Sequence, residues 1–159
     1  MLVLAACAGP SDARWTAGAA WTPLDLDNPH HYADPALPAP YLEPAVQAID
    51  NARAAPITDE GATLGRVLFF DPRLSVNDSV ACASCHIPAF GFTDTARFSR
   101  GHDGRPLAIR TMRLVNVRWY DGPGFFWDRR VPTLEAQATE PMTHPHELGW
   151  DPAHGGLSA

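Results

Sequence analysis

The stretch Cys82-Ala83-Ser84-Cys85-His86 decides how this chain is read. Two cysteines separated by two residues, with a histidine directly after the second, form the Cys-x-x-Cys-His pattern of c-type haem attachment. The two thiols add to the vinyl groups of haem, and the adjacent imidazole reaches the iron. We therefore expect covalent haem c, with Cys82 and Cys85 as its attachment points and His86 as the proximal iron ligand.

Two other chemistries use paired cysteines. A Cys-x-x-Cys redox pair belongs in a thioredoxin-like βαβ context, and the sequence around this motif lacks that pattern. A zinc site needs four ligands, and His86 directly after Cys85 fits such a site poorly because no second cysteine pair follows. The sequence therefore favours haem.

Composition describes an ordinary folded domain. Of the 159 residues, 45% are hydrophobic, which is enough for one compact core. The net charge of −6 gives no basic face, so we expect no nucleic-acid partner. No apolar run approaches the roughly 18 residues that would span a bilayer. We expect a chain that is soluble or tethered.

The third cysteine, Cys7, ends the run Leu4-Ala5-Ala6-Cys7, which resembles a bacterial lipoprotein cleavage box. The leader before it is shorter than the 7–15 apolar residues, roughly, of a secretory signal. A start codon assigned too far downstream would account for this, and a chance match is the alternative. Since haem attachment requires export, we expect a periplasmic protein, with residues 1–7 as a truncated lipoprotein signal and Cys7 as a candidate lipid anchor.

A high proline content distinguishes an N-terminal arm from the haem domain that follows it. Residues 8–57 are proline-rich and show little periodicity, which predicts an extended arm that wraps the domain or links it to an anchor. One short helix is predicted within Glu43–Arg53. The haem domain is predicted over residues 58–159. Aromatic residues in the arm indicate that parts of it pack down: Trp15, Trp21 and Tyr41.

The domain begins with an amphipathic helical pattern. Leu64, Val67 and Leu68 recur at i, i+3 and i+4, which gives a helix one apolar face. Asp71-Pro72 then ends the helix, because the residue before a proline disfavours helical backbone.

Two further helices are shorter. One begins at Ala81–His86, and another covers Leu134–Ala138, with Thr133 as N-cap and Pro141 as its end. No strand pattern of any length is present. The expected fold class is mainly α, a cytochrome c-like haem domain with short helices and long loops.

The flanks of the haem motif resemble a known family. The resemblance rests on Leu64-Gly65-Arg66-Val67-Leu68-Phe69-Phe70-Asp71-Pro72-Arg73-Leu74-Ser75, on Phe126-Trp127-Asp128, and on Leu134-Glu135-Ala136-Gln137 followed by Pro141 and Glu147. These residues are similar to the N-terminal haem domain of the bacterial dihaem cytochrome c peroxidases, which include the methylamine-utilisation-type dihaem enzymes. The resemblance covers roughly residues 60–150, and residues 1–57 carry none of it.

The resemblance implies roles for particular residues. In that family the N-terminal haem is where hydrogen peroxide is reduced, and a second haem in a C-terminal domain supplies an electron. By this resemblance His86 is the proximal ligand of the peroxidatic haem, and Gln137 and Glu147 lie on its distal side. Trp127 would lie towards the partner haem. His102, in Ser99-Arg100-Gly101-His102, would match a distal iron ligand that can leave.

Cleavage of the peroxide O–O bond requires proton transfer and hydrogen bonding, which the distal residues could provide. A carboxylate in a partly apolar pocket has a pKa raised by desolvation and can move a proton between the two peroxide oxygens. We expect Glu147 in this role, Gln137 holding peroxide by hydrogen bonding, and Pro141 shaping the pocket wall. The simpler alternatives are a surface carboxylate at Glu147 and a core aromatic at Trp127.

Several neighbouring residues have open interpretations. Met112 is a candidate sixth iron ligand, as in electron carriers. His144 and His146 could suggest a metal site, although a solvated loop is the simpler interpretation. Thr111 stands where calcium-binding relatives carry Asn, which makes calcium doubtful. Arginines that could pair with haem propionates are Arg110, Arg113 and Arg118.

One position departs from the family pattern. Relatives usually have Gly between Asp and Arg after the tryptophan, and this chain has Arg129 there. Because that glycine often adopts positive φ, we expect a strained or altered turn at Arg129.

The chain contains one haem motif. We therefore expect the second haem domain of the family to be missing from it, as in a fragment or an early-terminated product. The expected function is reduction of hydrogen peroxide with electrons from a small cytochrome or cupredoxin. A variant of this function oxidises a protein substrate. The alternative is a monohaem electron-transfer protein with His86 and either His102 or Met112 as axial ligands.

Overall fold

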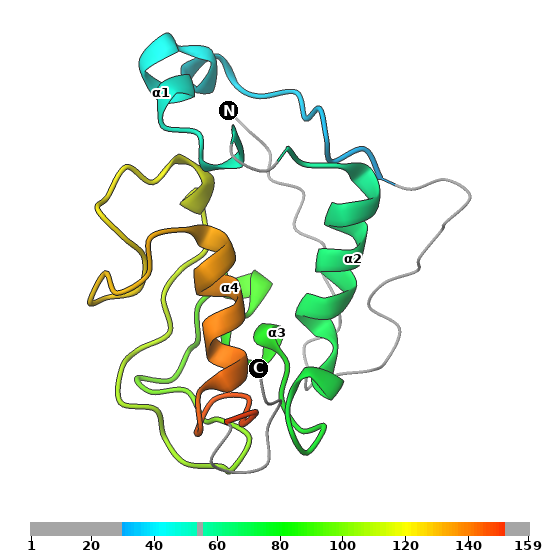
Figure 1. Cartoon of the computed structure of the whole chain (residues 1–159), viewed down its shortest axis with the longest axis vertical. Coiled ribbons are helices and arrows are strands. Elements are labelled where there is room, and N and C mark those ends of the chain that lie inside the picture. Colours follow the sequence, from blue (N-terminus) through cyan, green and yellow to red (C-terminus); the bar gives the residue numbers. More distant parts are fainter. Residues whose placement is uncertain (1–29, 54–55, 152–159) are drawn as a thin grey trace.

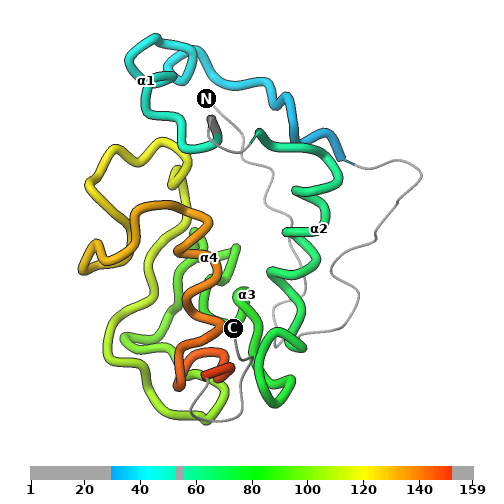
Figure 2. The backbone as a smooth tube through the Cα atoms, viewed as in Figure 1, coloured from blue at the N-terminus to red at the C-terminus, as the bar shows by residue number. Residues whose placement is uncertain are grey.

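The computed structural model describes residues 30–53 and 56–151, and every regular element within them is helical. In the view of Figure 1 the short helix α3 (Cys82–Cys85) lies between α2 (Asp59–Phe70) and α4 (Leu134–Thr143), and α1 (Pro44–Ala48) lies at one end. α3 contacts α2. Most of the chain between α3 and α4 is loop (Figure 2). This agrees with the predicted mainly α class with short helices and long loops.

The loops are closed by short-range pairings in place of a sheet. Isolated antiparallel bridges join Ile87 to Thr93, Arg100 to Pro106 and Phe125 to Val131. Within the described part of the chain these bridges are not extended into strands. The same part has no helix with the length and apolar content to cross a membrane.

Helix α2 forms as the sequence predicts. The Thr58 side chain caps it by accepting from the backbone N–H of Gly61 at 3.0 Å, and Asp59 and Glu60 place negative charge in the first turn. The helix ends at Phe70, directly before Asp71-Pro72. Both the helix and its stop are therefore confirmed.

Helix α4 runs further than predicted. Thr133 is its N-cap, as expected, and accepts from the Ala136 N–H at 3.2 Å. The prediction that Pro141 ends the helix is wrong, because α4 continues to Thr143. Proline lacks only its own N–H bond, and near the end of a helix this costs a single bond. The Pro141 carbonyl closes the last turn by accepting from the N–H groups of His144 at 3.4 Å and Leu148 at 3.2 Å.

The predicted helix within Glu43–Arg53 is divided in two. α1 ends at Ala48, and a separate 3₁₀ turn covers Asn51–Arg53. Between them the buried Asp50 carboxylate accepts from the Ala52 N–H at 2.9 Å. It also forms a two-pronged pair with Arg118, with Nε–Oδ1 at 2.7 Å and Nη2–Oδ2 at 2.6 Å. A side chain that bonds local backbone in this way competes with the helix.

The described part of the arm packs against the domain. Asp59 Oδ1 accepts from the backbone N–H groups of Tyr32 at 2.6 Å and Ala33 at 2.8 Å. The Tyr41 ring packs against Trp119 in a tilted arrangement, with ring centroids 5.3 Å apart. Packing of Tyr41 agrees with its aromatic character. The other residues predicted to act in the arm or its leader lie outside the described residues: Cys7, Trp15 and Trp21.

The backbone at Arg129 adopts the conformation expected of the glycine it replaces. Its φ is +60°, in the left-handed region. A non-glycine residue in this conformation destabilises the folded state by roughly 1–2 kcal/mol. Substitution by glycine removes this cost, but the greater freedom of glycine in the unfolded chain offsets roughly 0.5–1 kcal/mol of the gain. We therefore expect Arg129→Gly to increase the free energy of unfolding by about 0.5–1 kcal/mol, measured by urea denaturation. Arg129→Ala is the control and should give no such gain; an equal gain from Ala would exclude backbone strain as the cause.

Candidate haem site

The haem motif forms a single helical turn with both thiols available. The Ser84 hydroxyl accepts from the Ala81 N–H at 3.0 Å at the start of α3, and the His86 N–H donates to the Cys82 carbonyl at 2.9 Å at its end. Cys82 and Cys85 are half-buried free thiols. Burial raises the pKa of the Cys82 thiol and raises the pKa of Cys85 to about 11. Both sulfurs are therefore protonated thiols near neutral pH.

The His86 imidazole is oriented for metal binding. Its Nδ1 lies 2.9 Å from the Phe92 carbonyl oxygen, and a carbonyl can only accept, so Nδ1 carries the proton. Iron would bind the other ring nitrogen, Nε2, since most metal-binding histidines are held by a hydrogen bond from the nitrogen that is not the ligand. Burial lowers the pKa of His86, and hydrogen bonding to the backbone carbonyls of Phe92 and Met112 partly opposes this shift. Two thiols and a neutral imidazole on one turn are the donor set that a c-type haem requires, so these residues fit it.

The backbone of Phe92, whose carbonyl contacts His86, has an unusual conformation. Phe92 has φ +57°, a left-handed conformation that is costly for a bulky residue. Its N–H donates to the Ile87 carbonyl at 3.0 Å, which closes the loop after the haem helix. Phe92 is not predictable from the sequence as part of the site, because nothing in its residue type indicates a backbone contact.

A buried hydroxyl pair beside Cys85 was also missed. Ser99 is 1% exposed, and its hydroxyl pairs with that of Thr111, whose carbonyl accepts from the Thr93 hydroxyl at 2.7 Å. A hydrogen bond from Ser99 to Cys85 opposes the rise in the pKa of that thiol. These hydroxyls hold the Thr111 segment against the haem helix. Serine and threonine are too common for their positions to have indicated this.

Gln137 lies close to Met112. Its Nε2 is 3.9 Å from the Met112 sulfur, which brings α4 against the loop that follows Thr111. The Met112 carbonyl also acts on the pKa of His86. The structure therefore gathers Gln137 and Met112 on the side of the molecule that carries the haem motif.

Glu147 lies in the turn after α4, with its side chain 29% exposed. Burial raises its pKa and Glu140 adds to this, whereas His144 and Arg130 act against it. Its charge in turn contributes to the raised pKa values of Cys82 and Cys85. The direction of the Glu147 shift is the one expected of a proton-transfer carboxylate, and its catalytic role remains a prediction.

Trp127 is exposed. Its side chain is 60% accessible, and Nε1 donates to the Arg110 carbonyl at 2.8 Å. The interpretation of Trp127 as a core aromatic is therefore wrong. Its orientation towards a partner haem remains a prediction.

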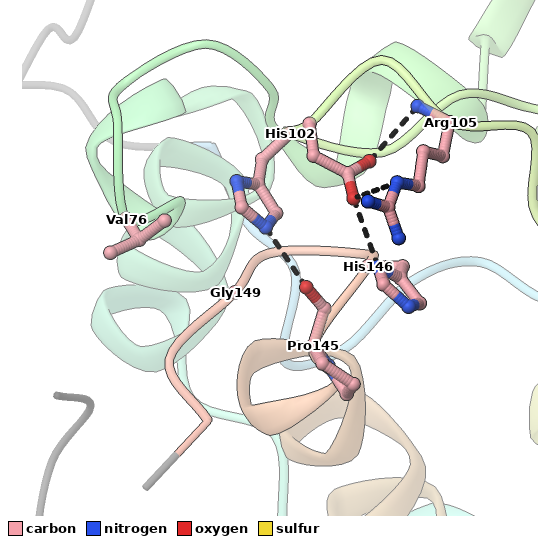
Figure 3. Close-up of a pocket in the computed structure, with 7 residues that line it drawn as sticks. Val76, His102, Arg105, Pro145, His146 and Gly149 are labelled. Carbon is pink, nitrogen blue, oxygen red and sulfur yellow. Dashed lines mark hydrogen bonds and ion pairs between the residues drawn. The ribbon is translucent and has the colours of Figure 1, made fainter. Parts of the chain in front are cut away.

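His102 lies on a cavity of about 300 Å³ shown in Figure 3, together with Val76, Pro145 and His146. Its ring is half-buried, and Nε2 lies 3.0 Å from the Pro145 carbonyl oxygen. The distal-ligand role of His102 remains a prediction, and it would require this hydrogen bond to break.

The other charged candidates have protein partners. Arg118 pairs with Asp50, so its fork is not free for a haem propionate. Arg110 donates to the Asp94 carbonyl at 3.1 Å. His144 lies 3.8 Å from Glu147, and His146 lies 2.9 Å from Asp103. Among residues 30–53 and 56–151, no three His, Cys, Asp or Glu side chains cluster as a metal-binding group.

Comparison with known proteins identifies similar sequences over the same region. Residues 59–156 match the family model described as di-haem cytochrome c peroxidase. The chain is 42% identical over 113 residues to the methylamine utilization protein MauG of Methylorubrum extorquens, covering 71% of this chain and 31% of that protein. It is 38% identical over 87 residues to the cytochrome c551 peroxidase of Nitrosomonas europaea, covering 55% of this chain and 25% of that protein.

A solved structure is similar as well. The crystal structure of a MauG-like protein associated with microbial copper homeostasis superposes with a TM-score of 0.55 and 29% sequence identity. The match covers 83% of this chain and 37% of that one. The chain therefore spans about a third or less of the length of the curated relatives named above.

Proposed function

Because the chain belongs to the di-haem cytochrome c peroxidase family, we propose that residues 58–151 form a cytochrome c-like domain that reduces hydrogen peroxide at a haem held by Cys82, Cys85 and His86. One observation carries the proposal. The turn that carries the half-buried Glu147 carboxylate is bonded to the loop that precedes the haem helix, where the Val76 N–H donates to the Leu148 carbonyl at 2.8 Å. An electron carrier has no use for such a group beside its haem.

The protein's part in this reaction is to handle protons. Reduction of hydrogen peroxide to water consumes two electrons and two protons. The haem, when bound, supplies the electron transfer to the O–O bond. Ionised Glu147 takes the proton from one peroxide oxygen and returns it to the other, which leaves as the first water. The remaining oxygen takes up two electrons from the redox partner and two protons from solvent and leaves as the second water. The Gln137 amide orients peroxide by hydrogen bonding, and Pro141 forms part of the wall.

The wider setting of the domain is part of the same proposal. Electrons come from a small cytochrome or a cupredoxin by way of a second haem domain, with exposed Trp127 towards that domain. The protein acts in the periplasm, and Cys7 carries its lipid anchor.

One observation favours a second candidate, a monohaem electron-transfer protein. The Met112 sulfur lies 3.9 Å from the amide nitrogen of Gln137, the residue that we place on the distal side of the haem. A thioether there is the usual sixth ligand of electron carriers.

Rapid mixing of the haem-loaded chain with hydrogen peroxide separates the candidates. We expect the haem spectrum to change at a rate proportional to peroxide concentration, with consumption of peroxide. An unchanged, low-spin six-coordinate spectrum in both redox states would identify the electron carrier instead. If peroxide reacts but a reduced small cytochrome is not oxidised, a protein substrate becomes the favoured electron source.

A further inference from the structure

We propose that His102 is a positioning residue that fixes Glu147 in place, and that its ring holds the protein backbone instead of an iron. The inference deepens the proposed function and rests on it, since it concerns the residue assigned to proton transfer. It is carried by the contacts between the loop around His102 and the turn Pro145–Glu147, of which Figure 3 shows those to Pro145 and His146.

His102 bonds this turn twice. Its backbone N–H donates to the Glu147 carbonyl at 3.0 Å, and its Nε2 lies 3.0 Å from the Pro145 carbonyl oxygen. From the other side, the Asn77 amide donates to the His102 carbonyl at 3.0 Å. His102 therefore joins the loop that precedes the haem helix to the turn that carries Glu147.

The hydrogen bond to the Pro145 carbonyl determines which ring nitrogen of His102 carries the proton. A carbonyl oxygen only accepts, so His102 Nε2 must carry the hydrogen and has no lone pair to offer a metal. Holding Pro145 and binding iron through Nε2 are therefore mutually exclusive. In this structure the ring holds Pro145.

The fit of the two segments requires glycine on each side. A Cβ at Gly101 would lie 1.5 Å from the His146 carbonyl oxygen and 3.2 Å from the Glu147 Cα. A Cβ at Gly149, where φ is +88°, would lie 2.5 Å from His102 Nε2. At Gly101 the two backbones are in direct contact, and at Gly149 the His102 ring lies against the backbone.

A second tether lies next to the first. The Asp103 carboxylate lies 2.9 Å from His146 Nδ1 and accepts from the Arg105 N–H at 2.9 Å. Pro145, His146 and the Glu147 backbone are thus all held by one loop. The nearest basic side chain to the carboxylate itself, His144, is 3.8 Å away. The backbone position of Glu147 therefore determines which positions its carboxylate can reach, and an error of about 1 Å in such a group can cost on the order of 10²-fold in rate.

Two substitutions at one position separate positioning from iron binding. His102→Leu removes the donor to Pro145, whereas the amide of His102→Gln can still donate to it. In the haem-loaded chain we expect His102→Leu to slow the peroxide reaction by on the order of tenfold. His102→Gln should stay within about threefold of the wild-type rate, since it keeps this bond. Both variants should keep the wild-type ferric absorption spectrum, and His102→Leu should speed hydrogen exchange at the residue-102 amide.

Each other result overturns the inference. A ferric spectrum altered equally in both variants would mean that His102 binds iron. A wild-type rate in His102→Leu would mean that it positions nothing that matters. If His102→Leu fails to fold, Asp103→Ala tests the second tether and should slow the reaction about two- to fivefold. The absence of any effect there would count against the inference.

The same measurements separate this inference from the proposed function. If Glu147→Gln reacts with peroxide at the wild-type rate, the function assigned to Glu147 fails, whatever His102 does. If Glu147→Gln is slow while His102→Leu is not, only the positioning role fails. If Glu147→Gln and His102→Leu are both slow, the variant that carries both substitutions should be no slower than Glu147→Gln alone, because the two residues act through one group.

Discussion

Glu147→Gln is expected to slow the reaction of the haem-loaded chain with hydrogen peroxide by about 10²–10⁴-fold, the usual contribution of a general acid–base. Glutamine keeps the size and hydrogen-bonding capacity of the side chain and removes only its ability to take a proton. The measurement is the second-order rate from rapid mixing. Glu135→Gln, on the exposed first turn of α4, is the matched control and should react like the wild type.

The pH dependence of this rate carries a second signature. Proton removal from peroxide requires the ionised carboxylate, and burial raises the pKa of Glu147. The wild-type rate should therefore fall as pH decreases through that raised pKa, at higher pH than for an exposed glutamate. The Glu147→Gln variant should lack this acid limb. A wild-type profile in the variant would assign the limb to another group.

Stability provides the control for folding. Because the folded-state pKa of Glu147 is raised, the folded chain binds this proton more tightly than the unfolded chain does. Its contribution to stability is therefore lost as pH rises from the ordinary glutamate pKa through the raised value. At neutral pH a neutral glutamine avoids that loss, so Glu147→Gln should unfold at the wild-type temperature or above it. A large destabilisation would mean that the kinetic effect reflects misfolding.

Replacement of both Cys82 and Cys85 by serine is expected to abolish covalent haem. Serine cannot add to the haem vinyl groups, and His86 alone holds haem only as a dissociable ligand. The measurement is haem staining of the denatured chain after electrophoresis, with haem content by absorbance. Cys7→Ser is the matched control because it also removes a thiol but lies outside the haem motif.

Single variants refine the same result. Cys82→Ser or Cys85→Ser leaves one thiol, so part of the haem should remain attached through a single thioether bond. Retention of covalent haem in the double variant would contradict the assignment of these two residues. Loss of covalent haem in Cys7→Ser would point to impaired export of the chain instead.

The sequence predicted the structure correctly where neighbouring residues alone determine the backbone conformation. The start and end of α2 follow from a threonine cap and an Asp-Pro stop, and both are observed. The strained turn at Arg129 followed from a bulky residue at a position where relatives carry glycine, and its positive φ is observed. The turn that bears the haem motif forms at the motif itself.

Prediction failed where contacts between distant residues override local rules. α4 passes Pro141 because the following turn folds back and donates to the proline carbonyl. The helix expected within Glu43–Arg53 breaks at Asp50 because its carboxylate pairs with Arg118, 68 residues away. At the site, the contact of Phe92 with His86 and the buried pair of Ser99 and Thr111 depend on tertiary packing. Residue type at those positions carries no such information.

The pair between Asp50 and Arg118 also bears on the order in which the chain folds. The segment between them holds α2, the haem motif and the loop beyond it, so this pair closes a loop of 68 residues. Closing a loop of that length costs roughly 4 kcal/mol of chain entropy. Such a contact is favourable only after the local turns inside the loop have formed. We therefore expect the segment around Asp50 to dock last during folding and to open first during unfolding, with the haem-binding turn formed before it closes.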